Sequence, residues 1–268
     1  MKPRLQEIVD AFHHYNSPDM AHQVFGLDES LTYDALVVAP AYTPMKLRME
    51  AEAQVTLLKE SAYTAGYLVE KEGLRIAWIK TSASASNCMD HMAVCAGLKI
   101  KKLIFVGAVG ALNPHIAVGD LCTPSYSIAG GYALSYLKDS IRDFTPFERV
   151  EPHSPLADRA IALAAAEGWE LKRASVFCTD SISAEYFHLK EIRSFGTDLI
   201  EMETAAFHTM ADLMELPAVA MLLVSDNSAA GVPLVGREGE AEQNYRHAQR
   251  EVLPRLIYKI AEIKQENV

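Results

Sequence analysis

Three carboxylates in the last third of the chain have a spacing that could support catalysis. Glu201 and Glu203 directly follow a short apolar segment that ends at Ile200, and Asp226 follows a longer apolar segment at 218–224. Carboxyl groups can act as general acids or bases, and ionised ones accept hydrogen bonds from hydroxyl groups. Because acidic residues at strand ends also serve as helix caps or solvated charges, their spacing alone leaves a structural role open.

The elements around these acids predict how they are positioned. Apolar residues between Ala205 and Met214 recur at helical spacing, so a helix is expected over about 204–215. Pro217 should end it, because proline disfavours helical geometry in the residue before it. The order strand, helix, strand predicts a βαβ unit, and such units place ligands at the carboxyl ends of their strands. All three acids are expected at that edge.

Composition limits the class of protein. The chain has 268 residues, half of them apolar and 22% charged, which fits one α/β domain over residues 1–268. A net charge of −10 without a basic stripe argues against a nucleic-acid partner. The apolar runs are shorter than a membrane span and the start of the chain lacks a continuous apolar region, so we expect a cytoplasmic protein with no membrane partner. Four residues are expected to be buried free thiols: Cys88, Cys95, Cys122 and Cys178.

The rest of the chain alternates between strand-like and helix-like segments. The patterns predict the following elements: helix 4–16, strand 34–39, a strand pair within 60–80, helix 88–98, strand 102–106, a strand within 119–136, helix 154–168, strand 173–180, and a C-terminal helix over 240–265 with a break at Pro254. Residues 138–155 are expected to form a surface excursion. The glycines at 107 and 110 are expected to allow a close turn and close approach by a ligand.

Two sequence blocks carry a family resemblance. One is "IEMETAAF" followed some twenty residues later by "LLVSDNS", and the other is "LIFVGAVGALNPHIAVGDLCTPSYSI" at 103–128. Their order and separation resemble the nucleoside phosphorylase superfamily, which includes hexameric purine nucleoside phosphorylases, uridine phosphorylases and methylthioadenosine nucleosidases. The resemblance extends over roughly residues 35–260. It implies a three-layer αβα fold with a central mixed, twisted sheet.

The resemblance also implies roles for the acidic cluster. Glu203 matches the family residue that holds the ribose hydroxyls, with Met202 packing on the sugar and Glu201 beside it. Asp226 matches the residue that protonates a purine at N7. Arg237 matches a loop arginine that supports this aspartate.

Further substrate contacts are expected on three other segments. The serine-rich loop 81–87 can offer hydroxyl and N–H groups to a ligand, although serine is equally common as a helix cap. The segment after residue 180 is where the family carries an aromatic ring that stacks on the base, and either aromatic there could instead belong to the core. The residues expected to contact substrate are Ser86, Ala108, Val109, Gly110, Tyr186 and Phe187.

The expected phosphate site departs from the family pattern. Phe105 and Ala108 stand where phosphorylases of the family carry an arginine and a hydroxyl residue. The usual Gly-Asp-Pro turn after the first strand is also missing. A displaced anion site at Lys46, Arg48 and Gly107 is one alternative, and two ordinary solvated cations are the other.

The function expected from the resemblance is phosphorolysis of a purine nucleoside, with inorganic phosphate as co-substrate and without another cofactor or a metal. Purine is favoured because "SISAEYFHL" lacks the glutamine and arginine that bind uracil in uridine phosphorylases. Two alternatives stay open. One is a hydrolytic purine nucleosidase or a relative that acts on a nucleotide, and the other is a nucleoside-binding protein without activity. The resemblance further implies a homo-oligomer, either a dimer or a hexamer built as a trimer of dimers.

Overall fold

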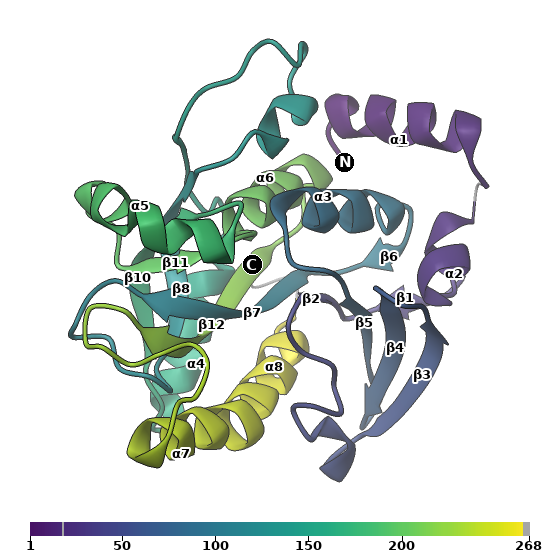
Figure 1. Cartoon of the computed structure of the whole chain (residues 1–268). Helices are drawn as coiled ribbons and strands as arrows, with labels where there is room; N and C mark the ends of the chain where they lie inside the picture. The colour runs from purple at the N-terminus through teal and green to yellow at the C-terminus, as the bar shows by residue number, and fades with distance from the viewer. Residues whose placement is uncertain (18, 265–268) are drawn as a thin grey trace.

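A mixed β-sheet forms the centre of the molecule (Figure 1). The computed structural model describes residues 1–17 and 19–264. Its strands are β1 (Thr32–Tyr33), β2 (Ala35–Ala39), β3 (Gln54–Glu60), β4 (Ala65–Lys71), β5 (Leu74–Lys80), β6 (Lys99–Ile100), β7 (Leu103–Ala111), β8 (Leu121–Ala129), β9 (Glu148–Val150), β10 (Leu171–Cys178), β11 (Leu199–Glu201) and β12 (Ala218–Asn227). Strands β1 and β6 pair apart from the others, which share one large sheet.

Helices pack on both faces of this sheet (Figure 1). They are α1 (Pro3–Tyr15), α2 (Met20–Phe25), α3 (Ala85–Val94), α4 (Leu156–Ala166), α5 (Ile182–Ser194), α6 (Thr204–Met214), α7 (Gly239–His247) and α8 (Leu253–Glu262). Helices α1, α3 and α6 contribute to one apolar core, and α4 and α8 contribute to a second core on the other face. The predicted three-layer α/β fold with a mixed central sheet is confirmed.

The strand order brings distant segments together. It runs β11-β10-β8-β12-β7-β2-β5-β4-β3, and β11 also pairs antiparallel with β7. Five strands therefore close into a ring, from β11 through β10, β8, β12 and β7 back to β11. Because β11 ends at Glu201 and β12 contains Asp226, ring closure places the two acidic segments on strands that both pair with β7.

Most predicted elements are present, and the predicted glycine turn is wrong. Strand β7 continues through Gly107 and Gly110 to Ala111, where a turn was expected. The chain stays extended at Gly110, because β7 pairs at this residue with β11 on one side and with β12 on the other. The predicted close approach to a glycine is found, but the approaching groups are protein side chains.

Two further differences concern strand β3 and the start of helix α3. Strand β3 was not predicted, because it is largely exposed at the sheet edge and lacks a clear apolar alternation. Helix α3 begins before the predicted Cys88, since the Ser84 side chain accepts a hydrogen bond from the Asn87 N–H and caps the helix. The C-terminal helix is interrupted at 248–252, just before Pro254, as predicted.

Two predictions about side chains and membranes can be compared with the structure. The four cysteines are buried and free, as predicted. Within the part of the chain that the structure describes, no helix has both the length and the apolar character needed to cross a membrane.

Lys102, just before β7, is a charged residue in the interior. Its side chain is 1% exposed, and its ammonium group donates hydrogen bonds to the carbonyls of Ala261, at 2.7 Å, and Ile263. These carbonyls lie at the end of α8, where helix carbonyls lack partners within the helix. Lys102 therefore joins the start of a central strand to the last turn of the C-terminal helix.

Candidate active site

Gly110 is the junction that assembles the acidic cluster. Its backbone is in register with Ile200 on β11 and with Asp226 on β12. A Cβ atom at this position would lie 2.9 Å from Asp226 Oδ2 and 3.1 Å from Ile200 Cγ2. Only glycine leaves that space free without a shift of these neighbours. The predicted importance of Gly110 thus has a steric basis.

A cavity opens at these strand ends. Its lining contains Pro40, Ala41, Ala83, Ala108, Gly110, Thr179, Ile182, Glu185, Ile200, Glu201, Met202, Glu203, Ser225, Asp226 and Leu234. Four of these residues are acidic, and none of the described residues in the lining is basic. Apolar side chains form much of the remaining wall. The cavity therefore combines apolar surface, which suits a flat ring, with carboxyl groups that suit hydrogen-bond donors.

Glu201 has a structural role in this cluster. Its carboxylate accepts hydrogen bonds from the Glu203 N–H at 2.8 Å, from the Thr204 N–H at 3.0 Å and from the Thr204 hydroxyl at 2.8 Å. The Cys178 thiol lies 2.9 Å from the same carboxylate and donates to it. Glu201 therefore caps the start of α6, and its oxygen atoms are already occupied by protein donors.

Glu203 has a buried carboxyl oxygen without a hydrogen-bond partner among the described residues. Its side chain is 4% exposed, and its Oε1 atom has no hydrogen-bond partner in the described part of the chain. Burial and the neighbouring charge of Glu201 raise the pKa of Glu203 well above its ordinary value. A buried acceptor without a partner is costly unless a ligand supplies a donor. Glu203 is thus ready to receive hydroxyl groups from a ligand.

Asp226 faces the same cavity from β12. The Ser225 hydroxyl lies 2.7 Å from Asp226 Oδ1 and 3.2 Å from the carbonyl of Val109. Burial raises the pKa of Asp226, while the Ser225 hydrogen bond and the positive charge of Arg237 lower it by less. A carboxyl group with a raised pKa retains its proton closer to neutral pH and can donate it.

Arg237 supports this segment from outside the cavity. Its guanidinium donates to the Ser225 carbonyl and to Glu242 Oε2 at 2.8 Å, and it lies over the ring of Tyr245 at 4.0 Å. It therefore fixes the backbone beside Asp226 and makes no direct hydrogen bond to the Asp226 carboxyl among the contacts described.

The other predicted residues divide into two groups. Met202 and Ala108 line the cavity together with Gly110, whereas Val109 acts through its carbonyl. Ser86 is exposed in the first turn of α3 and is not part of the lining. On α5, Tyr186 is 47% exposed and Phe187 is 87% exposed, and neither belongs to the lining.

Two lining residues on α5 were missed by sequence reasoning. Ile182 and Glu185 are three residues apart, so they share one helix face, and they follow the carboxyl end of β10. The rule that ligands bind at strand carboxyl ends indicates this segment, but it does not indicate which face of α5 meets the cavity. The search for an aromatic residue directed attention to Tyr186 and Phe187 instead.

The positions expected to bind phosphate are arranged differently. Phe105 is fully buried and packs against Phe207, with a ring-centroid distance of 5.4 Å. Its ring also occupies the space beside Gly107, where a Cβ would meet it at 2.6 Å. Lys46 lies outside the cavity and donates to the carbonyl of Ala41 at 3.0 Å. Arg48 is exposed.

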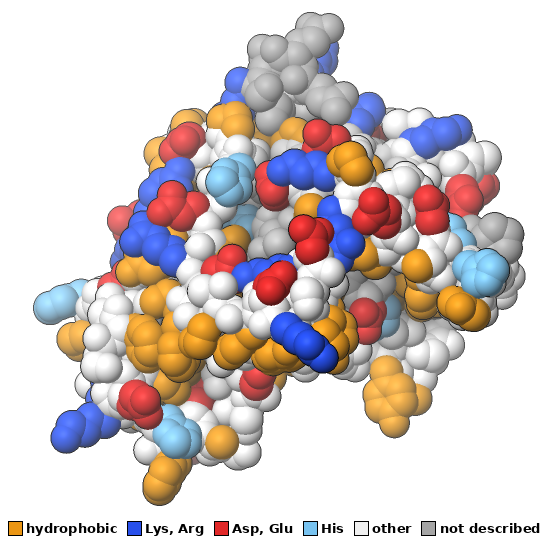
Figure 2. Space-filling model, turned by 90° about the horizontal axis from the view of Figure 1, so that it is seen from above, with side chains coloured by type: hydrophobic (Ala, Val, Ile, Leu, Met, Phe, Trp, Pro, Cys, Tyr) orange, Lys and Arg blue, Asp and Glu red, His pale blue; other side chains and the backbone are white. Residues whose placement is uncertain are grey.

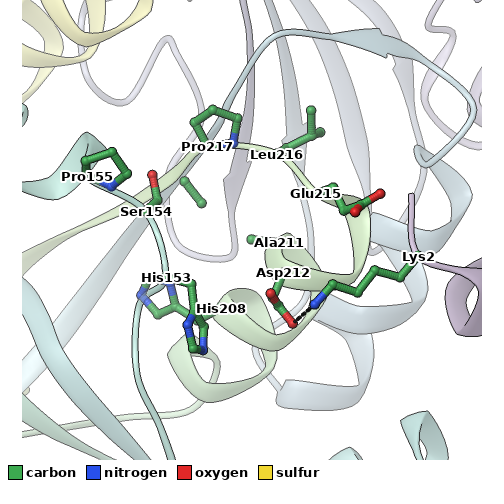
Figure 3. Close-up of a pocket in the computed structure, with 11 residues that line it drawn as sticks. Lys2, His153, Ser154, Pro155, His208, Ala211, Asp212, Glu215, Leu216 and Pro217 are labelled. Atoms are coloured by element: carbon green, nitrogen blue, oxygen red, sulfur yellow. Dashed lines mark hydrogen bonds and ion pairs between the residues drawn. The ribbon is translucent and has the colours of Figure 1, made fainter. Parts of the chain in front are cut away.

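A second cavity lies toward the other end of α6 (Figure 3). His153 and His208 both line this cavity, and Lys2 forms an ion pair with Asp212 at 2.7 Å. His208 Nε2 is buried without a partner in the described residues, and burial together with His153 lowers the pKa of His208 to about 3. This cavity contains none of the predicted site residues.

The phosphorylase superfamily model matches residues 45–257 of this chain, so the chain belongs to that superfamily. Among curated relatives, the chain is similar to the DeoD-type purine nucleoside phosphorylase of Exiguobacterium sibiricum, with 28% identity over 54% of this chain and 60% of the relative. It is also similar to the DeoD-type enzyme of Clostridium perfringens, with 32% identity over 48% of this chain and 53% of the relative. The chain thus spans between half and three-fifths of these relatives' length.

A solved structure supports the fold. The chain resembles the 5'-methylthioadenosine/S-adenosyl homocysteine nucleosidase of Campylobacter jejuni, with a TM-score of 0.67, 16% sequence identity, and coverage of 85% of this chain and 98% of that one. At this level of sequence identity the similarity shows a shared fold.

Proposed function

We propose that this protein cleaves the N-glycosidic bond of a purine nucleoside, with water as the preferred nucleophile. The observation that carries this proposal is the cavity in which Glu203, with a buried and unpartnered oxygen, and Asp226, with a raised pKa, face the same space. One acid suits the hydroxyl groups of a sugar, and the other suits a basic ring nitrogen that must be protonated before it leaves.

Asp226 would protonate the departing base. The bond between ribose and purine breaks with positive charge developing on the sugar, and the base leaves more readily once N7 carries a proton. Burial keeps the Asp226 carboxyl protonated nearer to neutral pH, which makes it a suitable general acid. Arg237 and Ser225 would hold it in position through the hydrogen bonds described above.

Glu203 would bind the ribose. The raised pKa of Glu203 keeps its carboxyl group protonated in the free protein, and hydrogen bonds from the ribose 2′ and 3′ hydroxyls would favour loss of this proton to solvent. The ionised carboxylate would then accept both hydrogen bonds and stabilise the positive charge that develops on the sugar ring. Glu201 would act indirectly, because its hydrogen bonds to the N–H groups of Glu203 and Thr204 fix the backbone from which Glu203 projects.

The charge of the cavity favours water over phosphate. Four carboxyl groups line it, and the described lining contains no basic side chain to offset a phosphate anion. Phe105 fills the space beside Gly107, where the sequence resemblance implied an arginine and a phosphate contact. A partly buried phosphate anion without a compensating cation is destabilised, and the charge of Glu201 would add repulsion.

Phosphorolysis is the second candidate, and two observations favour it. The similar curated proteins are named purine nucleoside phosphorylases. In addition, the Lys46 ammonium group is hydrogen-bonded to the carbonyl of Ala41, a residue of the cavity lining. A short movement of this exposed side chain could bring a cation to the cavity entrance.

Release of free base from adenosine, guanosine and inosine, measured with and without inorganic phosphate, tests these proposals. Hydrolysis predicts release at the same rate in phosphate-free buffer, together with free ribose as the second product. Strict dependence on phosphate and formation of ribose 1-phosphate would instead establish phosphorolysis. Nucleoside binding without release of base in either buffer would support the third alternative, an inactive binding protein.

We also propose that the protein forms a homo-oligomer. Figure 2 shows apolar side chains among interspersed acidic and basic ones on one face of the molecule. Several large apolar residues of the chain are exposed, including Tyr132 and the two aromatic residues that its ring contacts, Tyr136 and Phe144. Burial of such side chains between subunits would be favourable. Light scattering after size-exclusion chromatography distinguishes a monomer from a dimer or hexamer.

A further inference from the structure

Glu185 is an acidic residue of the cavity to which no role has been assigned above. It lies in the first turns of α5, one helical turn after Ile182, and both side chains line the cavity. Glu185 is half-buried, and it makes no ion pair with any residue that the structure describes. A carboxyl group directed at a cavity without a protein cation is available to a ligand.

The position of Glu185 within the cavity is on the side of Asp226. Burial and the charge of Asp226 raise the pKa of Glu185 to about 7. Burial raises the pKa of the neighbouring Tyr186, and the charges of Asp226 and Glu185 raise it further. Glu185 therefore lines the same cavity as Asp226, the acid assigned to the base, and lies close enough to interact with it electrostatically.

Purines present different groups next to N7. On adenine, the N7 acceptor is flanked by the 6-amino group, which is a donor; on guanine and hypoxanthine it is flanked by the 6-oxo group, which is an acceptor. With N7 at Asp226, the substituent at position 6 is the next group on that edge of the ring. An ionised carboxylate only accepts hydrogen bonds, so it favours an amino group and disfavours an oxo group there.

We propose that Glu185 accepts a hydrogen bond from the 6-amino group of the bound base and thereby makes this protein selective for 6-aminopurines over 6-oxopurines. The inference rests on the proposed function, because it takes N7 to face Asp226. Apolar lining residues, including Ile182, Ile200 and Leu234, would contact the ring faces and edges, leaving Glu185 as the group that distinguishes the substituents.

Calorimetric binding of the free bases adenine, hypoxanthine and unsubstituted purine tests this inference without requiring turnover. At pH 8, where Glu185 is mainly ionised, the wild type should bind adenine about 10- to 100-fold more tightly than hypoxanthine, as expected for one hydrogen bond to a charged group. Glu185→Gln should reduce that ratio to near one, because an amide can also donate to the 6-oxo group.

Two matched changes keep the result interpretable. Glu191→Gln removes an exposed acid from the same helix and should leave the adenine preference unchanged. Glu185→Ala removes the acceptor altogether and should bring adenine affinity down to that of unsubstituted purine. Melting temperatures establish that each variant is folded. If a variant fails to fold, the wild-type comparison of adenine with unsubstituted purine still decides whether the amino group is bound.

The inference would be overturned by an unchanged ratio in Glu185→Gln, by equal wild-type affinity for adenine and unsubstituted purine, or by a wild-type preference for hypoxanthine. Failure to bind any of the three bases would also overturn it. The proposed cleavage is judged separately by base release from nucleosides. Turnover without a Glu185-dependent base preference would contradict this inference and leave the proposed function intact.

Discussion

Each end of helix α6 adjoins a cavity with a buried titratable group, one atom of which has no hydrogen-bond partner among the described residues. The pKa values of these two groups are shifted in opposite directions. Glu203 precedes the first turn of α6 and has a raised pKa, while His208 faces the cavity toward the other end of the helix and has a lowered pKa. Burial explains both shifts, because it disfavours whichever form is charged. An unpartnered buried group therefore does not by itself identify an active site.

The two cavities are distinguished by the other residues that line them, together with Glu203 in one and His208 in the other. Glu203 shares its cavity with Asp226 and Glu185 at strand carboxyl ends, where ligands bind in open α/β sheets. His208 shares its cavity with His153 and with an ion pair between Lys2 and Asp212, whose charges already satisfy each other. The first cavity therefore contains the carboxyl groups that the proposed cleavage requires, and the lining of the second does not.

The largest expected effect is on turnover at the acidic cavity. Asp226→Asn should reduce cleavage of guanosine by about 10²–10⁴-fold, the usual contribution of a general acid. The loss should be much smaller for 7-methylguanosine, whose base is already charged and leaves without a proton. Steady-state kinetics on this matched pair measure the difference. Equal losses on both nucleosides in a folded variant would show that the proton comes from another group.

A smaller effect is expected on ribose binding. Glu203→Gln keeps the shape of the side chain but removes its charge, so nucleoside affinity should fall by about 1.5–3 kcal/mol. Calorimetry with a ribonucleoside and its 2′-deoxy analogue measures the loss. The variant should also discriminate less between the two. Unchanged affinity for both would exclude Glu203 as the ribose ligand.

The same substitution should increase stability at high pH. Folding raises the pKa of Glu203, so the folded state favours the protonated form and loses stability as pH rises above the ordinary value of 4.5. Glu203→Gln removes this loss. Its melting temperature should therefore exceed that of the wild type at pH 8, and the difference should shrink toward pH 4.5. A difference independent of pH would contradict the raised pKa.

At the other cavity the pH dependence should be reversed. Folding lowers the pKa of His208 from 6.5 to about 3, so its contribution to stability is present above pH 6.5 and is lost as pH falls toward 3. His208→Asn should make the melting temperature less sensitive to acid over this range, with little change in nucleoside affinity. His188→Asn, at an exposed site on α5, provides the control. Equal acid sensitivity of wild type and His208→Asn would refute the assignment.

The fold was predictable where local signals were strong. The apolar strands β2 and β12, the helix α6 and the break before Pro254 follow directly from apolar runs, helical spacing and proline geometry. Closure of the five-strand ring was not predictable in this way, because β11 has three residues and its pairing with β7 joins segments far apart in sequence. Long-range pairing leaves little trace in local composition.

In the candidate site, too, residues that depend on long-range packing could not be predicted from local sequence. Glu203 and Asp226 could be selected because they end apolar segments in a spacing that resembles a family motif. Glu185 could not be selected in that way, because its significance depends on the face of α5 that meets the cavity. The serine loop was placed correctly near α3, but Ser84 rather than Ser86 has the defined role, as a helix cap.

The hydrogen bonds of Lys102 set a limit on shortening the protein. Its ammonium group depends on the carbonyls of Ala261 and Ile263, and burial lowers the pKa of Lys102 to about 8. A truncation before Ala261 would leave a buried donor without acceptors, at a cost of at least about 1–3 kcal/mol. Expression variants should therefore retain Ile263, and affinity tags are best joined beyond it, where they leave this interior anchor intact.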